Sequence, residues 1–344
     1  MSEVRIEPLQ DDATASWDRF VQEAPEATFF HRAGWKAVVE RGFGHVCHFL
    51  QAKRAGRITG VLPLVQVSSR LFGNALISNA HCVYGGPIAT DPASLEALDR
   101  AAAQLGRQLR VDYLEYRLRH ASTRSWVRNS ALYATFRKQL AADPASNLRA
   151  MPRKRRAMVR KAQALGLRSE IDTDIGRFYP LYAQSVHNLG TPPYPPAYFR
   201  ALLEVFGSDC EILTVMRDAQ PLASVLSFRF RDEVLPYHSG ASAAARRCAA
   251  SDFMYWELMR RGCEGGARVF DFGRSKVGTG AFEYKRIWGF DPEPLHHEYL
   301  LLRVAEMPNL NPLNPRYAFL IAVWRRLPLF IANALGPRIS RGLG

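Results

Sequence analysis

The residues best suited to chemistry are concentrated between positions 267 and 290. A short apolar strand is predicted over residues 269–272, and a stretch rich in glycine and cations follows it. Backbone amides and cationic side chains of such a loop can converge on an anionic ligand at the end of a strand. The pattern therefore predicts a ligand site. The residues expected to bind substrate are Arg274, Ser275, Lys276, Gly278, Gly280, Tyr284 and Trp288, with Tyr237 and Ser239 from the end of an earlier strand.

Lys285 is the best candidate for catalysis, because it follows an aromatic residue on the far side of the glycine loop. A site of cations, amides and aromatic rings with few covalent nucleophiles suits direct acyl transfer from a bound donor to a bound amine. We expect Lys285 to stabilise the oxyanion of the tetrahedral intermediate, or else to lie over Trp288 without a catalytic role. Asp271 is expected to orient the amine or accept its proton, or to hold Arg274 or Lys276 in place.

A second cationic segment spans residues 152–168. It carries seven cations and no acid, and Met158, Ala162 and Leu165 recur at helical spacing, which predicts an amphipathic helix with a basic face. Like charges repel one another unless an anion neutralises them. We therefore expect this arm to bind an anion, with an ordinary solvated surface as the alternative. The cations assigned to the arm are Arg153, Lys154, Arg155, Arg156, Arg160 and Lys161.

The composition limits the class of protein. The chain has 344 residues, of which 47% are hydrophobic and 23% charged, and its net charge is +14. These values are typical of a globular protein with room for two domains, and the positive charge favours anionic partners. Five scattered cysteines without a C-x-x-C pair argue against a disulfide framework or a zinc site. No metal, signal peptide or membrane span is expected, so we predict a cytoplasmic protein.

The order of the predicted elements occurs twice. The first set has strands at 46–52, 58–67 and 75–89, a helix at 92–109 and a strand at 111–118. The second has strands at 211–217, 221–231 and 234–241, a helix capped by Ser251 and Asp252, and a strand at 268–272. The residues themselves do not repeat, so the duplication is one of architecture. It predicts two α/β domains of one type.

The chain changes character after residue 306. A loop is predicted over 309–315, followed by an apolar segment, 317–335, which contains two arginines. We expect an amphipathic helix that packs on the body of the protein, with a position in a membrane interface as the alternative. The domain boundaries predicted from these patterns are 1–150, 151–305 and 306–344.

Several motifs carry a family resemblance. In the glycine-rich stretch they are Phe270-Asp-Phe-Gly-Arg-Ser-Lys276, Gly278-Thr-Gly280 and Tyr284-Lys285-x-x-Trp288-Gly289-Phe290. Elsewhere they are Thr28-Phe-Phe-His31 with Trp35, Gly60-Val-Leu-Pro-Leu64, Leu189-Gly-Thr-Pro192 and Ser251-Asp-Phe-Met-Tyr-Trp-Glu257. Together these motifs resemble FemAB-type peptidyltransferase-like proteins, in particular the subgroup associated with PEP-CTERM/exosortase and exopolysaccharide loci. The resemblance spans most of the chain.

The resemblance implies tandem GNAT-like acyltransferase domains, an α/β (α+β) fold of mixed central sheets flanked by helices. Fem-type transferases take an aminoacyl group from a charged tRNA and add it to a peptidoglycan precursor, and their lysine at the position of Lys285 is thought to assist transfer. We therefore expect transfer to an amine or hydroxyl of a phosphate-linked or lipid-linked precursor of the cell envelope or exopolysaccharide. The cosubstrate would be aminoacyl-tRNA or acyl-CoA, with no permanently bound cofactor.

Two other functions fit the same residues. One is an N-acyltransferase that uses acyl-CoA, although the GNAT pyrophosphate loop is present only as Arg246-Arg247-Cys-Ala-Ala250, without its glycines. The other is a non-catalytic module that binds RNA or a membrane surface, and its affinity would fall steeply with salt. Peripheral membrane contact through the tail is compatible with each of these functions.

Overall fold

The structure is a computed structural model that describes residues 3–69, 73–306 and 315–342. The chain divides into two compact units. Unit 1 comprises residues 1–131, 295–314 and 338–344, and unit 2 comprises residues 132–294 and 315–337. This division differs from the predicted boundaries at 150 and 305, because strands near both boundaries pair with distant partners.

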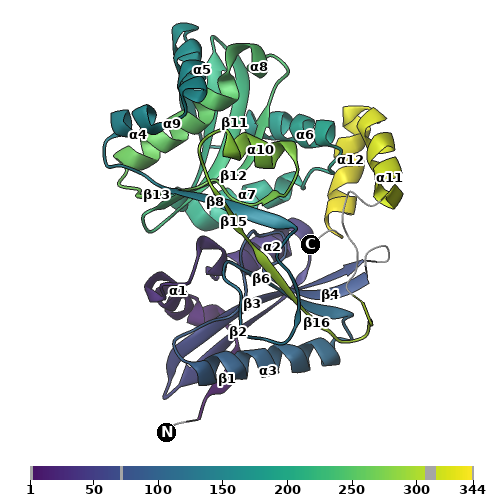
Figure 1. The fold of residues 1–344 in the computed structure, drawn as a ribbon. Helices are drawn as coiled ribbons and strands as arrows, with labels where there is room; N and C mark the ends of the chain where they lie inside the picture. Colours follow the sequence, from purple (N-terminus) through teal and green to yellow (C-terminus); the bar gives the residue numbers. More distant parts are fainter. Residues whose placement is uncertain (1–2, 70–72, 307–314, 343–344) are drawn as a thin grey trace. The chain divides into compact units, whose positions relative to one another are not determined.

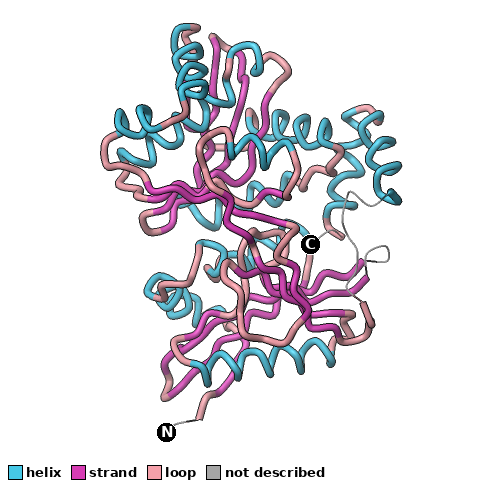
Figure 2. Tube along the Cα trace, in the orientation of Figure 1, coloured by secondary structure: helices cyan, strands magenta, loops and turns pink. Residues whose placement is uncertain are grey.

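Unit 1 contains a mixed sheet in the order β1-β2-β3-β4-β6-β16-β7, with β5 paired to β3. Its neighbours run antiparallel except for the parallel pair β4 and β6. The helices of this unit cover the sheet, as Figures 1 and 2 show. The strands are β1 (Arg5–Pro8), β2 (Val46–Arg54), β3 (Arg57–Ser69), β4 (Gly73–Ser78), β5 (Ile88–Ala89), β6 (Tyr113–Leu118), β7 (Val127–Asn129) and β16 (His296–Leu301), and the helices are α1 (Thr14–Glu23), α2 (Trp35–Phe43) and α3 (Pro92–Gln108).

Unit 2 contains a second mixed sheet in the order β14-β8-β13-β12-β11-β10-β9, with β15 paired to β8. Only β12 and β13 run parallel among its described pairs. Its strands are β8 (Tyr133–Gln139), β9 (Arg168–Asp172), β10 (Cys210–Arg217), β11 (Gln220–Phe230), β12 (Glu233–Ala241), β13 (Val269–Asp271), β14 (Ser275–Lys276) and β15 (Pro292–Pro294). Its helices are α4 (Pro144–Ala150), α5 (Arg153–Ala164), α6 (Phe178–Leu189), α7 (Pro196–Phe206), α8 (Ala245–Cys248), α9 (Ala250–Glu264) and α10 (Gly280–Arg286).

The predicted duplication is confirmed by the topology. In each unit, three antiparallel strands are followed by a helix and by a strand parallel to the third. The two sets are β2-β3-β4-α3-β6 and β10-β11-β12-α9-β13. A parallel pair needs a crossover, and the amphipathic helix between the two strands supplies it. The fold is therefore a tandem of GNAT-like α/β domains.

Helices α5 and α9 cover one face of the sheet in unit 2. Val159 and Ala162 of α5 belong to the same buried cluster as Val215 and Val225 of the sheet. Leu165, which the sequence placed on the apolar stripe of this helix, is exposed, because the helix ends at Ala164 and the chain turns through the glycine that follows. The basic helix itself is confirmed.

The start of α9 differs from the prediction. The helix begins at Ala250, and Ala249 precedes it with a left-handed φ of +56° and no side-chain cap. Ser251 and Asp252 therefore lie inside the first turn and do not cap it. The Asp252 carboxylate instead accepts a hydrogen bond from Arg155. This contact joins residues far apart in sequence, so the local sequence pattern does not predict it.

The tail forms two helices, α11 (Pro315–Arg326) and α12 (Leu329–Ser340), separated at Pro328. The predicted loop over 309–315 lies almost entirely outside the described residues. Trp324 and Ala332 are buried, so one side of the tail packs on the protein, as the sequence analysis favoured. No helix in the described part of the chain is long and apolar enough to span a bilayer.

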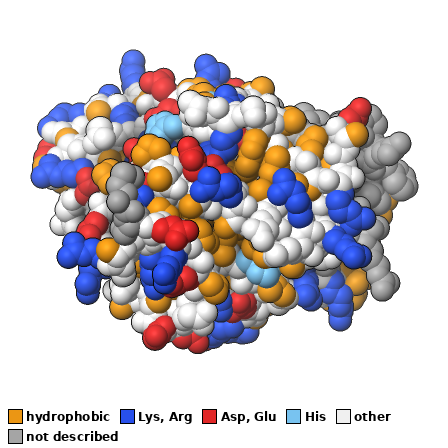
Figure 3. Space-filling view, turned by 90° about the horizontal axis from the view of Figure 1, so that it is seen from below, with side chains coloured by type: hydrophobic (Ala, Val, Ile, Leu, Met, Phe, Trp, Pro, Cys, Tyr) orange, Lys and Arg blue, Asp and Glu red, His pale blue; other side chains and the backbone are white. Residues whose placement is uncertain are grey.

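The surface is mixed in charge over the face shown in Figure 3, where Lys and Arg side chains alternate with Asp, Glu and apolar side chains. A denser group of positive charges lies on helix α5. Arg153, Lys154, Arg160 and Lys161 of α5 are all exposed.

Candidate active site

The candidate site lies where β12 and β13 separate in unit 2. These parallel strands pair only at Glu233 with Val269 and at Val234 with Phe270. β12 continues to Ala241 without a further partner on this side among the described pairs, while β13 ends at Asp271 and the chain enters the glycine-rich loop. The sheet therefore opens between β12 and the loop that follows β13.

Lys285 of α10 is buried beside this loop. Its Nζ donates hydrogen bonds to the carbonyl oxygens of Gly273, at 2.8 Å, and Arg274, at 3.1 Å. The ammonium also lies 5.5 Å from the ring centres of Phe136 and Phe272. Burial lowers the pKa of Lys285 to about 7, although the Asp271 carboxylate acts in the opposite direction. Near neutral pH, this amine therefore exchanges readily between its charged and neutral forms.

Asp271 is completely buried at the end of β13. Its carboxylate accepts hydrogen bonds from the guanidinium of Arg137, at 2.6 Å, and from the backbone amide of Gly273, at 2.9 Å. Thr135 donates a third, longer one. Asp271 thus fixes Gly273, the loop residue whose carbonyl oxygen accepts a hydrogen bond from Lys285. This geometry makes it a positioning residue, and the sequence reasoning did not single out Arg137, its cationic partner.

A second network joins the loop to the basic arm. The buried carboxylate of Asp252 accepts hydrogen bonds from Arg155 of α5, at 2.9 Å, and from the hydroxyl of Tyr284, at 3.3 Å. Burial raises the pKa of both Asp252 and Tyr284, and Arg155 opposes the change at Asp252. Arg155 and Tyr284, two predicted site residues from separate segments, therefore contact the same acid, Asp252. The sequence had predicted only a helix-capping role for Asp252. The signal that could have revealed the role of Asp252 was the presence of an acidic residue on an otherwise apolar helix face.

The remaining loop residues have structural partners. Ser275 and Lys276 form β14 against Ala134 and Tyr133 of β8. The Arg274 guanidinium lies 4.6 Å from the ring centre of Tyr133. Burial lowers the pKa of Lys276.

The two loop glycines precede α10. Gly278 has a φ of +77°, a conformation that favours glycine. Gly280 begins the helix, and the side chain of Thr279 caps it.

The predicted residues on β12 lie among aromatic side chains. Ser239 and the hydroxyl of Tyr255 are hydrogen-bonded at 3.0 Å, and Tyr237 contacts the ring of His238. Burial lowers the pKa of His238 to about 3, so its imidazole is neutral, and its Nε2 lies 3.3 Å from the hydroxyl of Tyr198. Sequence reasoning missed His238, since a lone histidine in an apolar strand carries no distinctive pattern.

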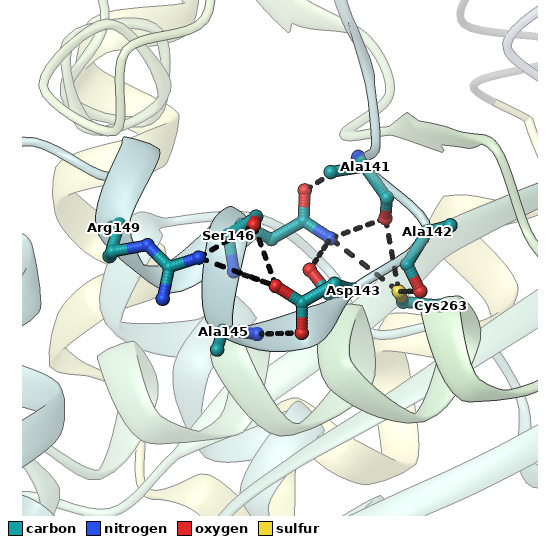
Figure 4. Close-up of polar contacts among 8 residues, drawn as sticks. Ala141, Ala142, Asp143, Ala145, Ser146, Arg149 and Cys263 are labelled. Atoms are coloured by element: carbon teal, nitrogen blue, oxygen red, sulfur yellow. Dashed lines mark hydrogen bonds and ion pairs between the residues drawn. The ribbon is translucent and has the colours of Figure 1, made fainter.

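Trp288 and Phe290, just after α10, line a cavity of about 160 Å³ together with Met151 and Met259. Its wall is mostly apolar. The neighbouring Cys263 thiol lies 3.1 Å from the carbonyl oxygens of both Ala141 and Ala142, as Figure 4 shows beside the Asp143 cap of α4. Burial raises the pKa of Cys263. This thiol is therefore a packing group and not an activated nucleophile.

The basic arm divides into two sets. Arg155 is committed to Asp252, and Arg156 donates to the carbonyl of Arg149 at 2.7 Å. The other four cations, Arg153, Lys154, Arg160 and Lys161, are exposed, and no acidic partner for them is found among the described residues.

A second cavity, of about 180 Å³, lies within unit 1. Its wall is mostly apolar and also carries His31, Arg119, Arg124, Ser122 and the acidic Glu26. The amide of Thr28 donates to Nδ1 of His31 at 3.1 Å, so the neutral ring carries its proton on Nε2. The sequence analysis named no site residue here, although Thr28-Phe-Phe-His31 was one of the resemblance motifs.

Comparison with known families supports this interpretation of unit 2. Residues 146–286 match the acetyltransferase (GNAT) domain family. The match includes the basic arm, β12, β13, the glycine-rich loop and Lys285. Comparison with curated proteins gives no match.

Solved structures with the same fold cover most of the chain. A crystal structure of FemX has 13% identity and a TM-score of 0.65, and the alignment covers 87% of this chain and 98% of that one. The C-terminal domain of a putative lysylphosphatidylglycerol synthetase from Agrobacterium fabrum has 13% identity, a TM-score of 0.55 and coverage of 86% and 92%. A tandem GNAT protein from the clavulanic acid biosynthesis pathway has 14% identity, a TM-score of 0.53 and coverage of 87% and 98%. The predicted tandem GNAT-like fold is confirmed, and FemX is among the structures that share it.

Proposed function

We propose that this protein is a transferase that moves an acyl or aminoacyl group from a bound donor to an amine or hydroxyl of a cell-envelope or exopolysaccharide precursor. The observation that carries the proposal is the buried Lys285, held by two loop carbonyls where β12 and β13 separate. The GNAT match over this region and the likeness to FemX support a transferase.

The transfer needs no covalent enzyme intermediate. The acceptor nitrogen or oxygen attacks the acyl carbonyl carbon, and the carbonyl oxygen becomes an oxyanion. Lys285, in its ammonium form, would stabilise that charge, which in turn favours its protonation. When the intermediate collapses, the carbon–oxygen bond of an aminoacyl ester or the carbon–sulfur bond of a thioester breaks. The leaving oxygen or sulfur takes up a proton equivalent to the one that the acceptor lost.

The exposed cations of α5 suit phosphate-bearing ligands. We therefore propose a phosphate-linked or lipid-linked acceptor, encountered on the cytoplasmic side of the membrane. The resemblance to Fem-type transferases, together with the fold shared with FemX, supports aminoacyl-tRNA as the donor. The GNAT match supports acyl-CoA.

The experiment is a transfer assay with each donor and a panel of amine and lipid-linked acceptors, followed by mass spectrometry. Lys285→Ala should lower kcat by roughly 10²–10³, as loss of an oxyanion donor does elsewhere. Arg286→Ala is the matched control, because Arg286 is the next residue and an exposed cation paired only with Glu283 among the described contacts. Full activity of Lys285→Ala would remove this lysine from the mechanism.

A second candidate is a non-catalytic module that binds a polyanion through the arm, and the four exposed cations of α5 favour it. Reversing Arg160 and Lys161 to Glu would abolish RNA binding and its steep salt dependence while leaving transfer to small acceptors intact. Arg155 is unsuitable for this test, because its loss would leave the buried Asp252 without its cation. Turnover with any donor would exclude a purely binding role.

A further inference from the structure

The last part of the chain is cationic and rich in apolar residues. Residues 307–344 contain five arginines and no aspartate or glutamate, and most of the remaining residues are apolar or small. All 32 acidic residues of the chain precede this segment, so its five arginines are not offset by any acid of its own. Within it, α11 and α12 (yellow in Figure 1) contain most of the described residues.

One side of these helices is anchored to unit 2. The ring nitrogen Nε2 of His187 donates to the carbonyl of Trp324 at 3.1 Å, and Arg325 donates to the carbonyl of Leu189 at 3.0 Å. Gly336 lies so close to Pro193 that an added Cβ would be 2.4 Å from its ring. The helices are therefore fixed on the protein through one side.

The other side exposes apolar side chains. Phe330 is 75% exposed, and Val323 and Leu335 are each 42% exposed. Leu189, whose carbonyl accepts the hydrogen bond from Arg325, is 68% exposed. Arg326 and Arg338 are exposed on the same two helices. Apolar and cationic side chains thus share the outer surface.

We propose that α11 and α12 bind the surface of an anionic lipid bilayer. Helices that lie in the bilayer interface place aromatic and aliphatic side chains among the acyl chains and cations at the headgroup phosphates. Phe330 and Leu335 supply the first kind of group, and Arg326 and Arg338 the second. A nucleic acid would satisfy the arginines but would leave the exposed apolar side chains in water. The inference is independent of the transfer reaction proposed above.

The test is vesicle flotation of the full chain with phosphatidylcholine vesicles that contain or lack phosphatidylglycerol. We expect binding only to the anionic vesicles. Arg326→Gln should weaken it about fivefold, since a cation near an anionic surface contributes about 1 kcal/mol. Phe330→Ser should weaken it roughly tenfold or more, as expected for removing an inserted aromatic side chain.

The matched controls are Arg57→Gln, which removes an exposed cation from β3 of unit 1, and Val46→Ser, which removes an exposed apolar side chain from the same unit. Both should bind like wild type. The proposal is overturned if wild type does not bind anionic vesicles, or if Arg57→Gln weakens binding as much as Arg326→Gln does. It is equally overturned if Phe330→Ser leaves vesicle binding unchanged but dissociates an oligomer in sedimentation velocity, because the apolar side chains would then contact a second copy.

Because Phe330 is exposed, its variant should keep the melting temperature of wild type. Transfer to a soluble acceptor should also be unchanged. Failure of membrane binding and failure of the transferase proposal are therefore measured separately.

Discussion

Lys285 shows how a single buried cation shapes the site. Transfer of an ammonium group out of water is unfavourable, and two carbonyl acceptors and two aromatic faces offset only part of that cost. The remaining cost appears as a pKa lowered to about 7, with burial as the main cause. A cation held in this way gains most when negative charge develops next to it, as in a tetrahedral intermediate.

The stability of the protein should depend on pH through this residue. The pKa of Lys285 falls from its ordinary value of 10.5 to about 7 on folding, so the unfolded chain binds more protons between these two values. The free energy of unfolding therefore rises with pH across this window, and below about pH 7 the full cost of the buried charge is present.

Urea denaturation of wild type and Lys285→Met at about pH 6 and about pH 9.5 tests this linkage. Relative to the variant, wild type should gain on the order of a few kcal/mol at the higher pH. The variant removes the titrating group but keeps an unbranched chain of similar length. An equal difference between the two proteins at both pH values would mean that Lys285 titrates like an exposed lysine.

Arg137 should be critical for stability although it lies outside the predicted site. It neutralises Asp271, whose carboxylate is completely buried. Arg137→Met would leave that charge without its cation and should destabilise the protein by about 3–5 kcal/mol. Arg286→Met, which breaks the exposed pair with Glu283, should cost less than about 1 kcal/mol. Similar midpoints for the two variants in denaturant would contradict this account of Asp271.

At the scale of elements, the sequence predicted the fold well. The alternation and helical spacing of apolar residues located both strand–helix sets, and most of their elements begin and end within a few residues of the prediction. The exception is the strand predicted over 75–89, which ends at Ser78 as β4, with only Ile88–Ala89 forming β5 after a turn region. The partners of β8 and β16 were not predicted. β8 reaches β13 across more than a hundred residues, and nothing in a local pattern specifies such a pairing. The domain boundaries differ from the prediction for this reason.

The same limit applies to the site. Lys285 and its loop could be predicted as a site because glycines, charged residues and aromatic residues are concentrated in one short stretch of sequence, residues 267–290. Arg137 was not singled out and Asp252 was predicted only as a helix cap, because each becomes important through a side chain that folding brings to it. The ends of α5 and α11 were misjudged for a different reason, since Gly166 and Pro328 interrupt an apolar pattern that would otherwise continue.

The contact of α6 with β12 gives a prediction at this scale. Gly240 of β12 lies against the backbone of α6, and an added Cβ would be 2.2 Å from the carbonyl carbon of Leu181. Backbone atoms cannot move aside as a flexible side chain can. Gly240→Ala should therefore destabilise the protein by at least about 3 kcal/mol, the upper part of the usual range for overpacking.

Gly280→Ala is the matched control for thermal denaturation, because an added Cβ there meets no atom within 4 Å. Its melting temperature should stay close to that of wild type, or rise slightly because alanine favours a helix. If Gly240→Ala were equally stable, α6 would not rest on β12 as closely as the structure indicates.

At the scale of the whole molecule, the chain leaves unit 1 at Ala131 and returns to it at Leu295. The returning strand, β16, pairs with β6 on one side and β7 on the other. It also brings two buried side chains. His297 lies 2.8 Å from Glu115, and the completely buried Glu298 accepts from Arg128 at 2.9 Å and from Ser122 at 2.6 Å. Unit 1 thus depends on residues that are synthesised after the first segment of unit 2, residues 132–294.

This dependence predicts how unit 1 behaves alone. Residues 1–131 lack β16, so the fragment leaves β6 with an unpaired edge and the two arginines near Glu298 without their acid. It should show no cooperative thermal transition by circular dichroism. Asn129 pairs with His297, so fusing Ala131 directly to Leu295 leaves Ser130, Ala131, Leu295 and His296 as a connection of ordinary hairpin length.

The fused chain, 1–131 joined to 295–306, should melt cooperatively, because it restores the strand with its two buried side chains, His297 and Glu298. The control carries the same twelve C-terminal residues in scrambled order, which preserves composition and charge but removes the register of β16. If the fragment 1–131 melted as cooperatively as the fused chain, β16 would be an accessory strand and unit 1 would be complete without it. If only the fused chain melted cooperatively, the late strand would be what closes the first unit, and folding of unit 1 would have to wait for the chain to emerge beyond residue 301.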